Sequence, residues 1–388
     1  MALSAAGPDW AAFRAGFPAL AGDVVHASTA GGGPVSSRAA AAARRYFDEA
    51  EAEGDAPWGR WLERVDGVRA EAAALIGAEA GDVAFLGSAS VALNAAAALL
   101  APGDRVVTVD GEFPSVTLPF VARGCRVEAA PLGPRGAPDL EALAETLSRG
   151  AAAVAVSHVQ FRTGRRLDLA ALGRMARAAG ALLIVDATQS LGAQRIDAPG
   201  WGISVLAASH YKWLCAGYGA GTAYLAPELR RRPSPVMGWR SAEEPYALEP
   251  FAARPAATAV RLEMGHPPFA PIFALGGALA HLAKTVGGGE GPEAAARGVA
   301  AVEARILTLG EALRARLAAL DGPQPLAAAE EGGIAVFPSA DPAGTKARLS
   351  AAGVSASASA GHVRLSLHAF LREDEAARAG EALVAALA

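Results

Sequence analysis

The chain has 388 residues, of which 52% are hydrophobic, and its formal net charge is −4. This composition supplies a large core and excludes a disordered chain, while the slight acidic excess argues against a nucleic-acid or membrane-surface binder. Two cysteines, Cys125 and Cys215, cannot build a disulfide framework, and no Cys/His cluster has zinc spacing, so we expect no metal. No secretion signal or membrane-length apolar run is recognisable, so we expect a cytoplasmic protein.

Short apolar runs alternate with longer helical stretches from about residue 83 onward. Continuous apolar runs are typical of strands that are buried on both faces, and segments between them, such as Leu169 to Ala179, have helical periodicity. The predicted strands are Val83 to Gly87, Arg105 to Asp110, Arg126 to Ala130, Ala152 to Ser157, Ala181 to Asp186 and Ile203 to Ala207. This alternation predicts an α/β fold with a mostly parallel sheet.

The pattern changes after Pro227. The Pro-rich segment from Arg232 to Pro268 predicts loops and short elements. The elements predicted beyond it are a long helix from about Pro292 to Leu320, strands at Ile334 to Phe337 and His362 to Ser366, and a final helix from Asp374. We therefore expect a large α/β domain over residues 20–285 and a smaller α+β domain over 286–388, with residues 1–19 packing on the smaller one.

One lysine stands out among the cationic residues. The chain has three lysines and 32 arginines, and Lys212 lies in the apolar, glycine-punctuated stretch Ala207 to Gly221. Lysine can lose its proton and attack a carbonyl to form a Schiff base, whereas arginine stays protonated. Lys284 has the context of a helix C-terminus and Lys346 lies in a polar helical segment, so a lysine without a chemical role is the alternative.

A carboxylate precedes this lysine at the end of a predicted strand. Asp186 closes the run Ala-Leu-Leu-Ile-Val, at the strand edge where open α/β sheets bind ligands, and Gln189 follows three residues later. A turn or helix-capping aspartate is the alternative. An acid at one strand edge and a lysine beyond the next strand are what pyridoxal phosphate requires, because the lysine carries the cofactor and the carboxylate keeps its pyridine nitrogen protonated.

A phosphate site is predicted near residue 89. The segment Phe85 to Asn94 offers a strand, a turn of small residues and a helix start. Backbone amides of Ala89 and Ser90 at that helix N-terminus, together with the Ser90 hydroxyl, could hold an anion. An ordinary serine N-cap is the alternative.

These motifs resemble those of the class V aminotransferase family of fold-type I pyridoxal-phosphate enzymes, whose relatives include cysteine desulfurases, kynureninases and isopenicillin N epimerase-like proteins. The motif Val185 to Gly192 is similar to the family's Asp-Ala-x-Gln signature, and Ser209 to Lys212 is similar to its Ser-x-(His/Tyr)-Lys signature. The resemblance covers roughly residues 20 to 385. It implies that Lys212 is the Schiff-base lysine and Asp186 the partner of the pyridinium nitrogen.

The resemblance also implies roles for the residues around the cofactor. Gln189 and Gln160 would lie beside its 3-hydroxyl group, and Phe113 would stack on its ring. Its phosphate would be held by Ala89, Ser90, Ser209 and Tyr211. Arg364 would grip the α-carboxylate of the substrate, a role that suits a planar bidentate guanidinium.

A further motif implies a second subunit. Arg261-Leu-Glu-Met-Gly-His266 resembles Arg-x-Glu-x-Gly-Thr, which reaches the phosphate in the neighbouring subunit, so Gly265 and His266 are candidate cofactor contacts. His266 stands where the family motif has threonine. The resemblance implies a homodimer with active sites at the interface.

The cofactor motifs leave the reaction open among transamination, epimerisation, β-elimination such as C–S cleavage, and kynureninase-type hydrolysis. Amino transfer on a small amino acid is our first hypothesis, with C–S lyase or epimerase activity as the alternatives. Desulfurases carry a cysteine on the loop before the carboxylate-binding arginine, but Val354 to Gly361 contains none, so we do not expect a desulfurase. His158, Trp58 and His368 are possible substrate-side groups or structural residues.

Two other classes of function are weighed against these. A nicotinamide-dependent oxidoreductase is the first, but Gly217-Tyr-Gly-Ala-Gly221 lacks the Gly-x-Gly-x-x-Gly spacing and follows the wrong element. The second is a non-catalytic protein on the same fold.

Overall fold

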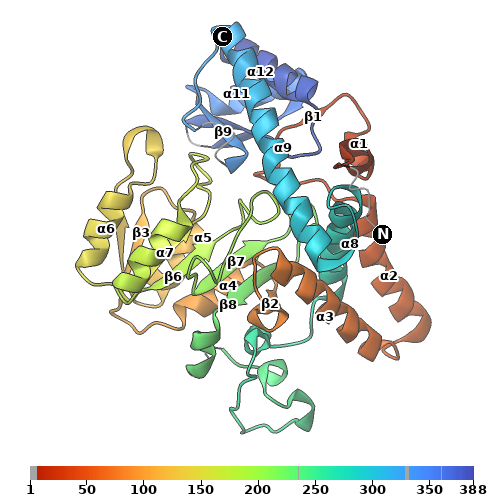
Figure 1. Ribbon diagram of the computed structural model, residues 1–388, viewed down its shortest axis with the longest axis vertical. Helices are drawn as coiled ribbons and strands as arrows, with labels where there is room; N and C mark the ends of the chain where they lie inside the picture. Colours follow the sequence, from red (N-terminus) through yellow and green to blue (C-terminus); the bar gives the residue numbers. More distant parts are fainter. Residues whose placement is uncertain (1–6, 235, 328–331, 360) are drawn as a thin grey trace.

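The computed structural model describes residues 7–234, 236–327, 332–359 and 361–388. Its centre is a seven-stranded sheet with the strand order β2-β8-β7-β6-β5-β3-β4. The strands are β2 (Val83–Leu86), β3 (Arg105–Val109), β4 (Arg126–Ala130), β5 (Ala153–Ser157), β6 (Leu182–Asp186), β7 (Val205–Ser209) and β8 (Gly221–Leu225). The predicted α/β class and mostly parallel sheet are confirmed (Figure 1).

The strand β8 is the exception to the parallel arrangement, because it pairs antiparallel with both β2 and β7. The sequence pattern did not predict β8, since glycine-rich sequence leads directly into these five residues. β7 also begins and ends two residues later than predicted, which places Ser209 inside the strand. The hairpin from β7 to β8 therefore carries the segment that contains Lys212.

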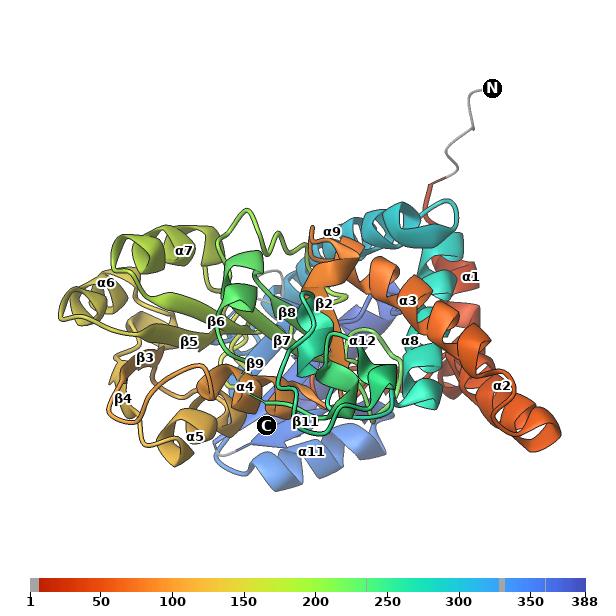
Figure 2. The same ribbon diagram turned by 90° about the horizontal axis from the view of Figure 1, so that it is seen from below.

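Both faces of the inner strands are buried, as the continuous apolar runs predicted, whereas the edge strand β4 is partly exposed. On β6, Ile184 packs into one hydrophobic cluster while Leu183 and Val185 pack into the other. One face is covered by α4 (Ala89–Ala97) and α5 (Pro114–Ala122). The opposite face is covered by α3 (Trp58–Ala74), α6 (Leu140–Ser148) and α7 (Leu169–Ala178), and Figure 2 shows the two helical layers on either side of the strands.

The C-terminal elements form a second, smaller sheet. It has the antiparallel order β11-β12-β9, formed by β9 (Ile334–Pro338), β11 (Ser357–Ser359) and β12 (His362–Ser366). The helices beside it are α9 (Gly291–Ala319), α11 (Pro342–Ala351) and α12 (Glu373–Leu387). In Figure 1, α9 runs from beside α8 (Phe269–Thr285) to these C-terminal elements, and it packs against both α8 and α12.

The N-terminal segment contacts both parts of the molecule. Helix α1 (Trp10–Ala15) packs on α8, while the Arg14 guanidinium pairs with Glu375 of α12 at 2.8 Å. Strand β1 (Val25–His26) pairs with β10 (Val354–Ser355), so the chain just after residue 20 also lies beside the C-terminal elements. The division into domains at residues 20 and 286 stays a prediction, and residues 1–6 lie outside the described part.

The helix α2 (Ser37–Glu53) follows this segment and packs along α8. A short 3-10 turn, Pro227–Arg231, precedes the Pro-rich region, which contains three more at Trp239–Ser241, Pro245–Ala247 and Ala259–Leu262, in agreement with the predicted loops and short elements. In the part of the chain that the structure describes, no helix is long and apolar enough to cross a membrane.

Candidate active site

A cavity of about 260 Å³, here named the Lys212 cavity, opens at the carboxyl ends of β5, β6 and β7. The strand register aligns Ser157 with Asp186 and Asp186 with Ala207, so the last residues of the parallel strands meet at one edge. The cavity is lined by Ala30, Gly31, Ala89, Ser90, Phe113, Ser115, Ser157, Val159, Phe161, Asp186, Thr188, Gln189, Ser209, Tyr211, Lys212 and Arg364. Nine of the sequence-predicted residues thus come together here.

Lys212 is held by the turn between β7 and β8. The Cys215 N–H donates to the Lys212 carbonyl at 3.1 Å, and the Gly33 N–H donates to the Tyr211 carbonyl at 2.8 Å. A Cβ atom on Gly33 would lie 2.3 Å from the Lys212 carbonyl oxygen. Only glycine fits this close approach, so the N-terminal segment and the lysine turn are built to pack together.

The environment of the Lys212 amine favours its neutral form. Burial lowers the pKa of Lys212 to about 8, and the positive charge of Arg364 lowers it further, although Asp186 acts in the opposite direction. A pKa close to neutrality leaves part of the amine unprotonated at pH 7. This lysine is therefore equipped to act as a nucleophile or a base.

Asp186 is buried at the end of β6. Burial raises the pKa of this carboxyl group, whereas a hydrogen bond of 2.8 Å from the Thr188 N–H to Oδ1 and the charge of Lys212 favour ionisation. A buried carboxylate of this kind gains stability from a positively charged partner.

Small polar groups gather at the N-terminus of α4. The Ala89 N–H donates to Ser209 Oγ at 3.0 Å, and the hydroxyl groups of Ser90 and Ser115 are 2.8 Å apart. Ser88, not Ser90, is the N-cap residue, so the Ser90 hydroxyl has a different place in the fold. The helix N-terminus and these hydroxyls suit an anion.

The first residue of β8 makes this arrangement possible. A Cβ atom on Gly221 would lie 2.7 Å from the Ala208 carbonyl oxygen and 3.1 Å from the Ala89 nitrogen. Glycine therefore lets β8 pass directly against the start of α4. Sequence reasoning assigned no role to this position.

Two glutamines lie close to the cavity in fixed orientations. Gln189 donates from Nε2 to the Ala30 carbonyl at 2.9 Å and accepts from Trp213 Nε1 at 3.1 Å. Because the indole N–H can only donate, it fixes which end of the Gln189 amide is oxygen. Gln160 does not line the cavity; its Nε2 donates to Glu112, and its Oε1 is buried without a partner among the described residues.

The two residues predicted to contact the ring and the substrate both line the cavity. Phe113 packs edge-on against Phe161, with ring centroids 5.2 Å apart. Arg364 donates from Nη1 to the Phe161 carbonyl at 2.5 Å, and its buried Nε has no partner among the described residues. Burial lowers the pKa of Arg364. A buried guanidinium with free donor capacity is suited to a carboxylate.

Tyr211 lies at the mouth of the cavity, stacked on the exposed Tyr218 with ring centroids 4.3 Å apart. The Lys212 amine lies 5.6 Å from the centroid of the Tyr211 ring. Burial raises the pKa of Tyr211, so its hydroxyl stays protonated near neutral pH and can donate a hydrogen bond.

The Arg261–His266 motif lies outside the Lys212 cavity. Glu263 is buried, pairs with Arg69 at 2.5 Å and accepts a hydrogen bond from the Phe85 N–H, so it serves the fold. Gly265 and His266 are exposed, and the His266 ring packs edge-on against Trp58. Their predicted contact with a neighbouring subunit's phosphate stays a prediction.

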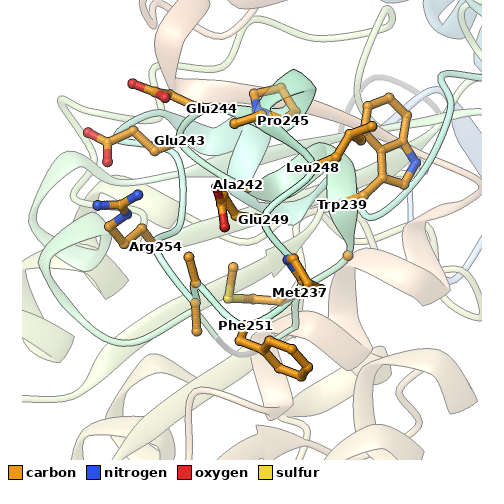
Figure 3. Close-up of a pocket in the computed structure, with 15 residues that line it drawn as sticks. Met237, Trp239, Ala242, Glu243, Glu244, Pro245, Leu248, Glu249, Phe251 and Arg254 are labelled. Atoms are coloured by element: carbon orange, nitrogen blue, oxygen red, sulfur yellow. The ribbon is translucent and has the colours of Figure 1, made fainter.

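A larger hollow lies elsewhere, in the loops at the bottom of Figure 1. This loop hollow has a volume of about 450 Å³ and is lined by residues 237–239, 242–245 and 247–254. Figure 3 shows its side chains, among which Glu243 and Arg254 lie close to one another. It contains no lysine, histidine or cysteine, so we take the smaller Lys212 cavity, where the reactive groups converge, as the candidate active site.

The three possible substrate-side groups do not line the Lys212 cavity. His158 is fully enclosed, with its pKa lowered to about 3 by burial, and packs against Trp201. His368 stacks on Trp213, and burial lowers its pKa to about 4. Trp58 belongs to the surface cluster with His266. In the described part of the chain, these three residues pack against other aromatic rings, so they serve the fold.

Sequence reasoning missed several residues of the site. Glu112 lies directly behind the cavity, and Ser115, Thr188 and the Ala30–Gly31 backbone line it. The triple glycine of residues 31–33 and the Gly-Glu-Phe-Pro-Ser sequence of residues 111–115 were the available signals. Nothing in the sequence showed that residue 30 lies beside residue 189.

The residues present fit pyridoxal phosphate. The set combines a lysine with a lowered pKa, a buried carboxylate, an anion-binding helix start and an aromatic ring at the cavity wall. Each matches one chemical feature of the cofactor: its aldehyde, its pyridine nitrogen, its phosphate and its ring.

Comparison with known proteins decides the family. A family model described as aminotransferase class V matches residues 57–383. The chain belongs to the class V aminotransferase family. Pyridoxal phosphate is therefore the cofactor of this class V enzyme, and the family predicted from Lys212 and Asp186 is confirmed.

Individual relatives of the class V enzyme have different names. The chain is 32% identical over 240 residues to an uncharacterised aminotransferase, YcbU, from Bacillus subtilis, covering 61% of this chain and 63% of that protein. It is 33% identical over 241 residues to a kynureninase from Deinococcus radiodurans, covering 61% of this chain and 57% of that one. The matched region thus spans less than two thirds of either relative.

Solved structures share the fold of the class V enzyme. The cysteine desulfurase CsdA from Escherichia coli superposes with a TM-score of 0.80 at 21% identity, covering 97% of this chain and 98% of that one. The cystine C-S lyase C-DES, in complex with cysteine persulfide, gives a TM-score of 0.81 at 19% identity, covering 95% and 99%. At these identities the likeness establishes the fold alone.

Proposed function

We propose that this enzyme acts at the α-carbon of a small amino acid and that amino transfer is its reaction. The observation that carries the proposal is the presence in one cavity of the Lys212 amine, the Asp186 carboxylate and the Arg364 guanidinium. Bound pyridoxal phosphate supplies an electron sink that weakens the bonds at the α-carbon of an amino acid. The protein supplies the positioning and the proton transfers.

Each group has one task in this proposal. Lys212 carries the cofactor and, once free and neutral, accepts the proton from the α-carbon. Its pKa of about 8 suits a base that works near neutral pH. Asp186 keeps the pyridine nitrogen protonated, and Arg364 orients the α-carboxylate. The start of α4, with Ala89, Ser90 and Ser209, would hold the phosphate.

The number of bases favours some reactions over others. Among the described residues that line the cavity, Lys212 is the one amine, and Tyr211 has a raised pKa. Amino transfer and β-elimination can both proceed with one base on one face of the substrate, whereas epimerisation needs proton delivery from the opposite face as well. A C–S lyase activity is therefore our second candidate, ahead of an epimerase.

The positions of the thiols support the proposal that the enzyme is not a cysteine desulfurase. Cys125 and Cys215 are buried, neither lines the Lys212 cavity, and burial raises the pKa of both thiols. A persulfide mechanism needs an accessible thiolate close to the substrate. The loop 354–361 carries no cysteine, although residue 360 lies outside the described part.

We also propose a homodimer, in which the exposed Gly265 and His266 of one copy approach the site of the other. A surface aromatic cluster, formed by the half-buried Trp58 and Trp239 and the exposed Tyr246 and His266, supports a subunit contact in this region. Cross-linking and mass measurement in solution test the oligomeric state. A monomer at micromolar concentration would contradict this part of the proposal.

Product analysis tests the reaction. The purified enzyme with bound cofactor is incubated with single amino acids, with and without a 2-oxo acid, and the products are identified. A keto acid, together with cofactor left in its amine form, supports amino transfer. Pyruvate and ammonia with unchanged cofactor would contradict amino transfer and support β-elimination. No spectral change with any amino acid would instead support a non-catalytic protein.

A further inference from the structure

Glu112 has an unusual set of contacts directly behind the Lys212 cavity. It precedes Phe113, which lines the cavity, in the turn that links β3 to α5. Its Oε1 accepts hydrogen bonds from the Ser157 N–H and from Gln160 Nε2, both at 2.7 Å. Its Oε2 accepts from the Ser157 hydroxyl at 2.6 Å and from the Phe113 N–H at 3.1 Å. One carboxylate therefore joins two segments of chain, its own turn at residues 112–113 and the end of β5 at residues 157–160.

The position of these donors explains what the carboxylate can control. Ser157 is the last residue of β5 and is aligned with Asp186 on β6. Phe113 is the N-cap residue of α5 and is 42% exposed, so little packing holds it in place. Among the described residues, its one ring contact is the edge contact with Phe161. The hydrogen bonds from Ser157 and Gln160 to Glu112 thus link the Phe113 turn to the strand edge.

The charge state of Glu112 is finely balanced. Burial raises the pKa of Glu112 to about 7, and the charge of Asp186 raises it further, while the donors from Ser157 and Phe113 oppose the shift. Burying an ionised carboxylate costs free energy unless hydrogen-bond donors compensate for the lost water. The four hydrogen bonds that the Glu112 carboxylate accepts favour a role in holding neighbouring segments in place.

We propose that Glu112 is a positioning residue, which ties the Phe113 turn to the end of β5 and so holds Phe113 at the cavity wall and Gln160 beside it. This inference rests on the proposed use of the Lys212 cavity for the cofactor. The carboxylate acts through Phe113 and Gln160 and touches neither cofactor nor substrate itself.

The substitution Glu112→Gln distinguishes the roles of the two carboxylate oxygens. The amide oxygen can take the place of Oε1 and still accept from Ser157 and Gln160, and the amide NH₂ can donate to the Ser157 hydroxyl. The NH₂ group cannot accept from the Phe113 N–H, so that single bond is lost. Glu112→Ala removes all four bonds. Glu128→Gln, an exposed glutamate on β4, is the matched control.

Amide hydrogen exchange of the cofactor-free protein provides the first readout. We expect exchange at the Phe113 amide to quicken about tenfold or more in Glu112→Gln while the Ser157 amide stays protected, and both amides to quicken in Glu112→Ala. The Glu128→Gln control should match the parent protein. Unchanged exchange at both amides in Glu112→Ala would overturn the inference, because that variant removes the bonds to Ser157 and Gln160 that join the turn to β5.

The bound cofactor provides the second readout. Loss of a fixed aromatic wall should raise the dissociation constant of pyridoxal phosphate roughly threefold to tenfold and reduce its visible circular dichroism, with Glu112→Gln lying between the parent and Glu112→Ala. If exchange changes but affinity and dichroism do not, Glu112 ties the turn without positioning the site, and the inference is wrong. A parent enzyme without activity would count against the proposed function alone, since the exchange result does not depend on turnover.

Discussion

The Lys212 cavity and the loop hollow differ in volume and in the elements that form them. The loop hollow is larger, at about 450 Å³ against about 260 Å³, but it is formed by turns whose side chains, such as Phe251, are largely exposed. The Lys212 cavity is built on strand ends, and hydrogen bonds to the backbone fix its Asp186, Gln189 and Ser209 side chains. Convergence of reactive groups on rigid elements, rather than volume, distinguishes the candidate active site.

The largest expected effect separates Lys212 from the other lysines. Lys212→Arg keeps the charge but cannot form the covalent link, so activity should fall by roughly 10²–10⁴-fold. Borohydride reduction followed by peptide mass spectrometry should find the cofactor on Lys212 in the parent protein and on no lysine in the variant. Lys284→Arg, on the last turn of α8, is the control and should behave as the parent. Labelling at Lys284 instead would refute the assignment.

A second substitution tests the substrate side of the Lys212 cavity. Arg364→Lys retains a positive charge but loses the planar fork, and a lost charged hydrogen bond costs about 1.5–3 kcal/mol. KM for the amino acid should rise by about tenfold to a hundredfold, with a smaller change in kcat. The control is Arg348→Lys, since this arginine lies on α11 away from the cavity. An unchanged KM would show that another group binds the carboxylate.

The pH dependence of cofactor capture follows from the Lys212 amine. Its pKa of about 8 lies below the ordinary value for lysine, so the reactive neutral form grows as pH rises and levels off above about pH 8. At pH 6 only about one hundredth of the amine should be neutral. The rate at which cofactor-free protein takes up pyridoxal phosphate should therefore rise steeply between pH 6 and 8. A plateau reached only above pH 10 would mean that burial does not shift this lysine.

The smallest effect is expected in the loop hollow. Phe251 is 97% exposed, so Phe251→Ser should change the free energy of unfolding by less than about 0.5 kcal/mol and leave cofactor capture unaltered. Phe120→Ser, in the buried core under the sheet, should destabilise by several kcal/mol. Thermal unfolding of both variants measures the contrast. A large loss from Phe251→Ser would show that a partner buries this surface.

Much of the fold could be predicted because its signals are local. Strands that are apolar throughout, such as β5 and β6, can be predicted to be buried on both faces from their own residues. β8 was missed because its short sequence follows glycines and gains its place only by pairing with β2 and β7. The pairing of β1 with β10 joins residues more than 300 positions apart, and no local sequence pattern predicts it.

The candidate site divides in the same way. Lys212, Asp186 and Arg364 could be proposed because each lies within a motif of a few residues, and the structure places all three at one cavity. Trp213 orients Gln189, and Ser157 and Gln160 donate to Glu112, through contacts between separate segments. Gln160 was expected beside the cofactor but lies behind the cavity wall, bonded to Glu112.

The sequence by itself determined the fold class and the cofactor and supplied the candidate residues for the chemistry, because each depends on residue types at short spacing. Only the tertiary structure decided the lowered pKa of Lys212, the fixed orientation of Gln189 and the burial of Glu112. These properties arise from desolvation and from hydrogen bonds between distant segments, which exist only once the chain has folded.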